Sequence, residues 1–84
     1  MPYIKAHKRR RIDCDLANLP NMNNSGELNY VLTKIILSYL NQKGCGYSTM
    51  NDIVGALDSA KAEFQRRVVA PYEDEKIKEN GDVY

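Results

Sequence analysis

The stretch that decides the fold is ELNYVLTKIILSYLNQ, residues 27–42 of an 84-residue chain. At 3.6 residues per turn, one broad face of a helix collects six apolar side chains: Leu28, Val31, Leu32, Ile35, Ile36 and Tyr39. The roughly opposite side carries Tyr30, Thr33, Leu37 and Leu40, and the polar stripe between them is limited to Glu27, Lys34, Ser38 and Asn41. A helix that is apolar nearly all round is buried on more than one side. One short chain offers too few internal partners for both faces, so we predict a homo-oligomer.

The segment that follows predicts an antiparallel helical hairpin. Lys43-Gly44-Cys45-Gly46 is a strong helix stop, because glycine tolerates the backbone that ends a helix. Ser48 or Thr49 is then expected to cap another helix, whose apolar stripe is Ile53, Leu57, Ala60 and Phe64. Two apolar helices joined by a short glycine-rich loop favour a hairpin as the centre of a small all-α domain spanning residues 1–84.

Shorter elements are expected at both ends of this hairpin. Residues 1–7 read as extended, a short helix is expected over 8–19, and a loop over 20–26 leads to Ser25 as the next N-cap. Pro71 is expected to break or kink the chain and to begin a separate last helix that ends at Asn80-Gly81. Acidic residues 73–75 in the first turn of that helix agree with its dipole.

Composition excludes several classes of protein. Hydrophobic residues make up 43% and charged residues 27% of the chain, which is typical of a globular domain. No apolar run approaches the ~20 residues that span a bilayer, and no secretory signal is recognisable, so a cytoplasmic protein without a membrane partner is expected. Cys14 and Cys45 are predicted to be reduced thiols, and His7 is the single histidine, so no metal site and no cofactor is predicted.

Charge is unevenly distributed along the chain. Residues 1–12 carry five basic side chains and no acid, whereas residues 71–84 carry five acids and two lysines. The compact run Lys8, Arg9, Arg10 and Arg11 could bind nucleic acid as part of a flexible basic arm over residues 1–11. The alternative is that this arm pairs with the acidic tail, within one chain or across an oligomer.

Two signatures carry a resemblance to a known family. GELNY at residues 26–30 and RRVVAPYEDEKIKENGDVY at residues 66–84 resemble a family of small prokaryotic and phage proteins of unknown function. The resemblance covers roughly residues 26–84. It implies a prokaryotic or viral setting and a compact protein, and it implies no activity.

No arrangement of residues predicts catalysis. The acids gather on one segment, without a matching pair on a second helix that could hold magnesium. Serine or cysteine catalysis is not supported either, because the single histidine, His7, lies in the N-terminal arm. We therefore expect no enzyme.

Binding is the expected function. Helical oligomers readily form pockets between subunits, and five residues could line a pocket for an anion such as a nucleotide signal: Arg66, Arg67, Tyr72, Tyr30 and Lys34. Inhibition of a host protein is a second form of the same hypothesis, and an accessory protein that binds nucleic acid through the arm is the alternative. Helical geometry places Arg67 at the edge of the apolar stripe, whereas Arg66 points away from that stripe. Arg67 also has a purely structural interpretation, in which its stem packs and its head pairs with Glu63 one turn earlier.

Overall fold

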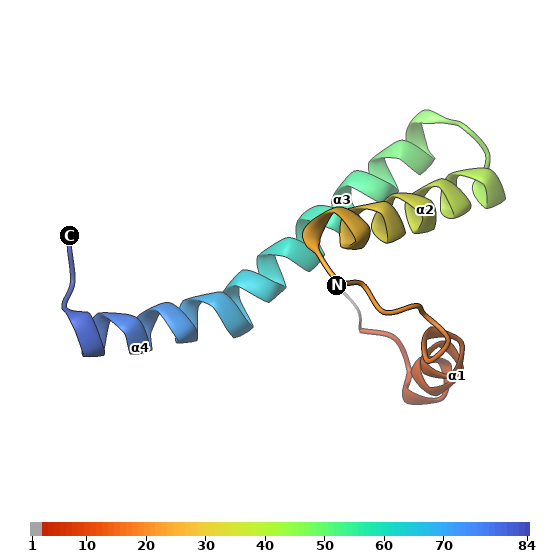
Figure 1. Ribbon diagram of the computed structural model, residues 1–84. Helices are drawn as coiled ribbons and strands as arrows, with labels where there is room; N and C mark the ends of the chain where they lie inside the picture. The colour runs from red at the N-terminus through yellow and green to blue at the C-terminus, as the bar shows by residue number, and fades with distance from the viewer. Residues whose placement is uncertain (1–2) are drawn as a thin grey trace. The chain divides into compact units, whose positions relative to one another are not determined.

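The computed structural model describes residues 3–84 and is helical throughout, with no strand in that range (Figure 1). Its elements are α1 (Ala6–Leu16), α2 (Ser25–Lys43), α3 (Tyr47–Phe64), a π-helical turn η1 (Gln65–Val69) and α4 (Ala70–Asn80). The chain divides into two compact units, Met1–Gly46 and Tyr47–Tyr84. The all-α prediction is confirmed, and the hairpin stays a prediction.

Helix α1 begins and ends earlier than the sequence suggested. It spans Ala6–Leu16 rather than residues 8–19, so the basic run is helical. After Leu16 the chain tightens into a turn, in which the amide of Asn18 donates to Asp15 O at 3.2 Å and that of Leu19 to Leu16 O at 3.0 Å. Pro20 prevents the helix from continuing further, because the residue before a proline is pushed out of the α conformation.

Helix α2 is capped one residue before the expected position. Asn24, rather than Ser25, is the N-cap: its Oδ1 accepts from the Glu27 amide at 2.9 Å. In turn, the Glu27 carboxylate accepts hydrogen bonds from the Asn23 backbone amide and from the Asn24 side-chain amide, both at 3.2 Å. This reciprocal arrangement satisfies donors that a helix start leaves without partners.

Glycine ends both α2 and α4, as the sequence predicts. Gly44 has φ 91° and Gly81 has φ 87°, a region that side chains with a Cβ rarely adopt. Their amides donate to Leu40 O at 2.9 Å and to Ile77 O at 2.8 Å. Helix α3 begins at Tyr47, so Ser48 and Thr49 lie in its first turn rather than before it.

The last helix expected at Pro71 is present as α4, which begins at Ala70 with Pro71 in its first turn, but the chain does not break in front of it. The backbone stays helical from α3 through η1 into α4, since Phe64, Val69 and Ala70 all have right-handed helical dihedrals. The Ala70 amide donates to Gln65 O, five residues back, instead of four. A proline inside an α-helix clashes with the carbonyl four residues earlier and has no amide to offer it. The wider π turn in front of Pro71 relieves this conflict without ending the helix.

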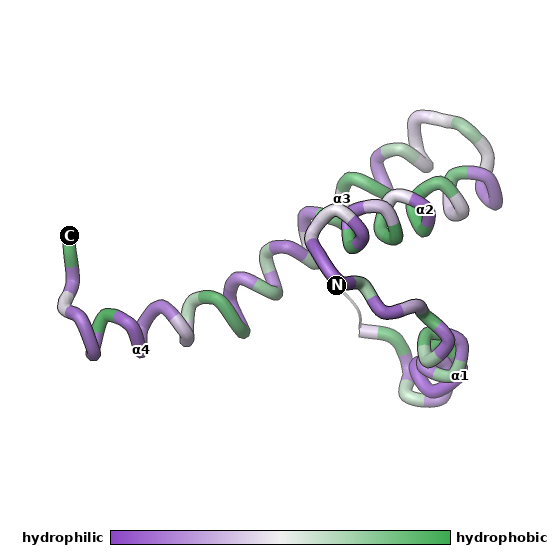
Figure 2. The backbone as a smooth tube through the Cα atoms, in the orientation of Figure 1, coloured by the Kyte–Doolittle hydropathy of each residue, from purple (hydrophilic) through white to green (hydrophobic). Residues whose placement is uncertain are grey.

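Large apolar side chains are not enclosed anywhere in residues 3–84. Thr49 is the one buried residue in this range, and the stripe expected to form the core stays open, with Leu57 42% and Phe64 58% exposed. Figure 2 shows hydrophobic residues gathered along α2 and α3, whereas α1 and α4 are largely hydrophilic. The structure therefore has helices with apolar faces but no internal core.

Candidate functional site

Two arginines on the π turn share one carboxylate. Arg67 Nε lies 2.8 Å from Glu63 Oε2, and Arg66 Nη2 lies 3.0 Å from the same oxygen. The predicted Glu63–Arg67 pair is present, and Arg66 pairs with the same carboxylate as well. Positions three and four residues apart are both neighbours on a helix, which is why one acid reaches both cations.

The arginines also change the acidity of Glu63. Hydrogen bonds from Arg67 first, and then from Arg66, hold the pKa of the Glu63 carboxyl below its ordinary value of 4.5. Both arginine side chains remain more than 60% exposed. One carboxylate against two guanidinium groups leaves a formal charge of +1 on an open surface, which suits an anion.

Two tyrosine–lysine pairs account for the other predicted site residues. Lys34 Nζ lies 5.4 Å from the centre of the Tyr30 ring in α2, and Lys76 Nζ lies 5.5 Å from that of Tyr72 in α4. Both distances are typical of cation–π contacts. The structure thus brings Tyr30 and Lys34 together within the first unit, and places Arg66, Arg67 and Tyr72 in the second. Lys76 was missed, although its i,i+4 spacing from Tyr72 was a readable signal.

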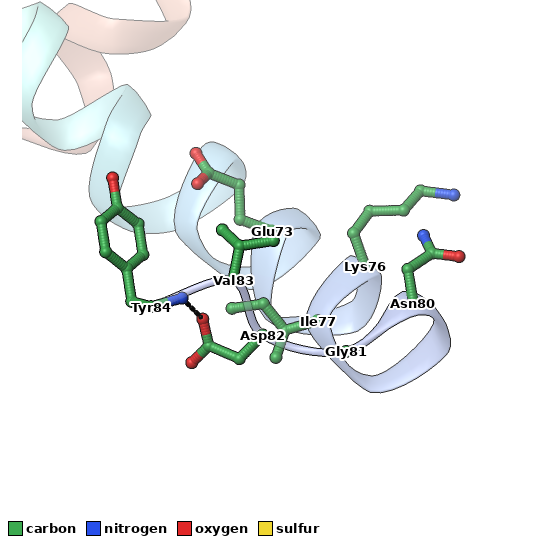
Figure 3. Close-up of a pocket in the computed structure, with 8 residues that line it drawn as sticks. All are labelled: Glu73, Lys76, Ile77, Asn80, Gly81, Asp82, Val83 and Tyr84. Carbon is green, nitrogen blue, oxygen red and sulfur yellow. Dashed lines mark hydrogen bonds between the residues drawn. The ribbon is translucent and has the colours of Figure 1, made fainter.

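An open hollow of about 290 Å³ lies between α4 and the last residues of the chain (Figure 3). Its walls include Glu73, Ile77, Val83 and Tyr84, and the Tyr84 amide donates to the Asp82 carboxylate at 2.9 Å. A second hollow of about 230 Å³ continues along the same helix, and its lining shares Glu73 and Ile77 with the first. Neither hollow is lined by Arg66, Arg67 or Tyr72, so sequence reasoning missed this face of α4.

The acidic residues of α4 fall into two groups. Glu79 pairs with Lys76 at 3.1 Å and Glu75 with Lys78 at 3.4 Å. Glu73 and Asp74 form no ion pair within residues 3–84, and both line the second hollow. Glu73 lies in the first turn of α4, but the helical backbone continues into α4 from the π turn, so the predicted dipole role of these acids has no free helix end to act on.

The basic run lies on α1 with its cations exposed. Lys8, Arg9, Arg10 and Arg11 are consecutive, so they point in different directions around the axis. None of them pairs with an acid elsewhere in the described part of the chain. Their charge is therefore available to a partner.

Other chemistry has little structural support. Cys14 and Cys45 are exposed and unpaired. Across residues 3–84 there is no cluster of three side chains able to ligate a metal. None of the helices in this range has the length and apolarity needed to cross a membrane.

Comparison with known proteins places the chain in a family. The model of the family described as "Domain of unknown function (DUF6899)" matches residues 1–83, and the chain therefore belongs to this family. No curated protein and no solved structure matches the chain.

Proposed function

Since the family has no assigned function, we propose from the structure that the chain is a non-catalytic binding protein that works as a homo-oligomer. Within each copy, the helices present apolar faces, and other copies complete the core. The assembled protein binds an anionic small molecule. A cytoplasmic, prokaryotic or phage setting is part of this proposal.

The missing core carries the proposal. No hydrophobic side chain in residues 3–84 is buried, and large apolar residues of α2 and α3 stay open, among them Ile35 at 49% and Phe64 at 58% exposed. Obligate subunit interfaces are more hydrophobic than other interfaces and resemble a domain core cut in half. An assembly that covers these side chains would supply the apolar contacts that the described residues lack.

The exposed apolar faces of helix α2 favour packing against more than one partner. Leu28, Leu32 and Ile35 on its broad face are 42–49% exposed, and Leu37 on the opposite side is 48% exposed. An exposed patch that extends over two faces of one helix is unusual for a monomer. Packing of a second copy against α2 explains why both faces are apolar.

The ligand class follows from the π turn. Arg66 and Arg67 present two planar guanidinium groups against one carboxylate, and Tyr72 follows on the same helix. Guanidinium groups bind phosphate and carboxylate through paired hydrogen bonds, and aromatic rings stack on bases. A nucleotide fits both features, so sequestration of a nucleotide signal is the form of binding that we propose; inhibition of a host protein would use the same surface.

A thermal-shift screen against mono-, di- and cyclic nucleotides tests the ligand. A nucleotide at 100 times its Kd should stabilise the folded assembly by about 2.7 kcal/mol. The double variant Arg66→Ala/Arg67→Ala should lose this shift, whereas the control Lys61→Ala, which removes a cation from the preceding turn of α3, should keep it. A shift that survives in the arginine variant would rule out this site, and no shift with any nucleotide would rule out this ligand class.

A further inference from the structure

We propose that helix α1 of one copy docks on α4 of a second copy, through faces that are complementary in charge and apolarity. The inference rests on the assembly proposed above and names the contact that joins the copies. Its two sides are the acidic face of α4, defined by Val69, Ala70, Glu73, Asp74 and Ile77, and the basic face of α1, defined by Lys8, Arg9, Ile12 and Leu16.

The acidic face has an apolar floor between two carboxylates. Ala70 and Ile77 lie about 20° apart around the helix axis, and Glu73 and Asp74 lie about 50° to either side of them. These residues line the second hollow together with Val69, and Ile77 is 43% exposed. The two carboxylates have no cationic partner within residues 3–84. Two unpaired acids beside exposed apolar surface are complementary to a partner that supplies both cations and apolar groups.

The basic face is the counterpart of this arrangement. Ile12 and Leu16 are 45% and 47% exposed and lie about 40° apart around the α1 axis. Lys8 and Arg9 flank this stripe, each within about 60° of its centre. Their cations are unpaired in the described part of the chain. Apolar side chains would therefore meet apolar side chains in the middle, with cations opposite carboxylates on both edges.

The same contact explains a feature that the helix geometry leaves open. Glu73 and Asp74 cannot serve a helix start, because the helix continues through Ala70. Glu75 and Glu79, on the other side of α4, are neutralised by lysines of the same helix. Glu73 and Asp74, which line the second hollow, are therefore the acids of α4 that could pair with another molecule. Helix α1, the most basic segment of the chain, has the matching pattern.

Charge reversal tests the contact. The variants Lys8→Glu/Arg9→Glu and Glu73→Lys/Asp74→Lys should each weaken self-association at least about tenfold, measured by sedimentation velocity, because like charges then face each other. Matched controls reverse the same number of charges on the opposite sides of the two helices: Arg10→Glu/Arg11→Glu and Glu75→Lys/Glu79→Lys. These controls should associate as the unchanged protein does. Equal effects of face and control variants would overturn the inference.

Mixing the two face variants identifies the partner. Copies with Lys8→Glu/Arg9→Glu and copies with Glu73→Lys/Asp74→Lys should associate with each other more tightly than either does with itself, since only the mixed contact joins opposite charges. The inference fails if mixing does not restore association but a single chain that carries both pairs of changes associates normally, because α1 then docks within its own chain. It also fails if the Lys8→Glu/Arg9→Glu variant keeps its mass and instead loses affinity for duplex DNA. If the unchanged protein is monomeric, the proposed assembly itself is wrong. If the unchanged protein is an oligomer and neither pair of substitutions weakens it, the docking contact alone is wrong.

Discussion

Glu63 joins two arginines of the π turn, and its protonation is the clearest effect expected of a single residue. Its pKa is lowered in the folded chain, so its contribution to stability is complete above its ordinary pKa of 4.5 and is lost as the pH falls through the lowered value. The pair is exposed, so its contribution at neutral pH is small and weakens with salt. The sign of the pH dependence is nevertheless fixed by the direction of the shift.

The substitution Glu63→Gln should remove this part of the acid sensitivity. Thermal unfolding followed by circular dichroism, from neutral pH down to about pH 3, should show a smaller loss of Tm for Glu63→Gln than for the unchanged protein. Glu75→Gln, which removes one exposed carboxylate of α4, is the matched control and should leave the acid sensitivity nearly unchanged. An identical acid profile for Glu63→Gln and the unchanged protein would show that the arginines do not hold the carboxylate in solution.

Asn24 is the second residue with a separable effect. Its side chain accepts from the Glu27 amide at 2.9 Å, so Asn24→Ala should lower the free energy of unfolding by about 1 kcal/mol, whereas Asn24→Asp should retain the cap. Asn23→Ala is the control, because Asn23 contributes its backbone amide and not its side chain. Urea unfolding measures all three variants. Equal losses for Asn23→Ala and Asn24→Ala would contradict the assignment of the cap.

At the scale of the elements, the π turn determines how α4 continues from α3. It shifts the hydrogen-bond register by one residue, which rotates α4 by up to about 100° relative to a continuous α-helix. Helical spacing places Glu73, Asp74 and Ile77 on one face of α4, and this rotation sets the direction of that face relative to α3. The turn thus positions the acidic face as well as accommodating Pro71.

Replacing the proline should separate helicity from association. In Pro71→Ala the restored amide can donate four residues back, so the π turn is no longer required and helicity should be equal or greater. The acidic face should then point elsewhere relative to α3, so self-association should weaken. Circular dichroism and sedimentation velocity on the same samples measure the two effects. Undiminished association at full helicity would show that the register of the π turn does not matter.

Local chemistry explains which elements the sequence could predict. Gly44 and Gly81 end their helices as expected, because the positive φ at each position is a property of glycine itself. The Glu63–Arg67 pair was predictable because i,i+4 spacing makes neighbours on any helix. The continuous helical path into Pro71 was not predicted, because the hydrogen bond from the Ala70 amide to Gln65 O, five residues back, leaves no mark in the spacing of apolar residues. The hollow beside Ile77 was missed because it depends on the path of residues 81–84, which have no periodicity.

At the scale of the whole molecule, the proposed assembly predicts how stability depends on protein concentration. No described large apolar side chain is buried, and in the proposed oligomer other copies cover these side chains. Folding and association should therefore be coupled. Thermal stability should rise with protein concentration, and Tm measured over a hundredfold dilution series should fall steadily; a Tm independent of concentration would contradict this coupling.

The most direct test of the account is the mass of the protein in solution at micromolar concentration, by light scattering or sedimentation, together with its unfolding transition. The account predicts a cooperatively folded species whose mass is a multiple of 9.6 kDa. A species of 9.6 kDa that unfolds cooperatively, at a Tm that does not change on dilution, would contradict it.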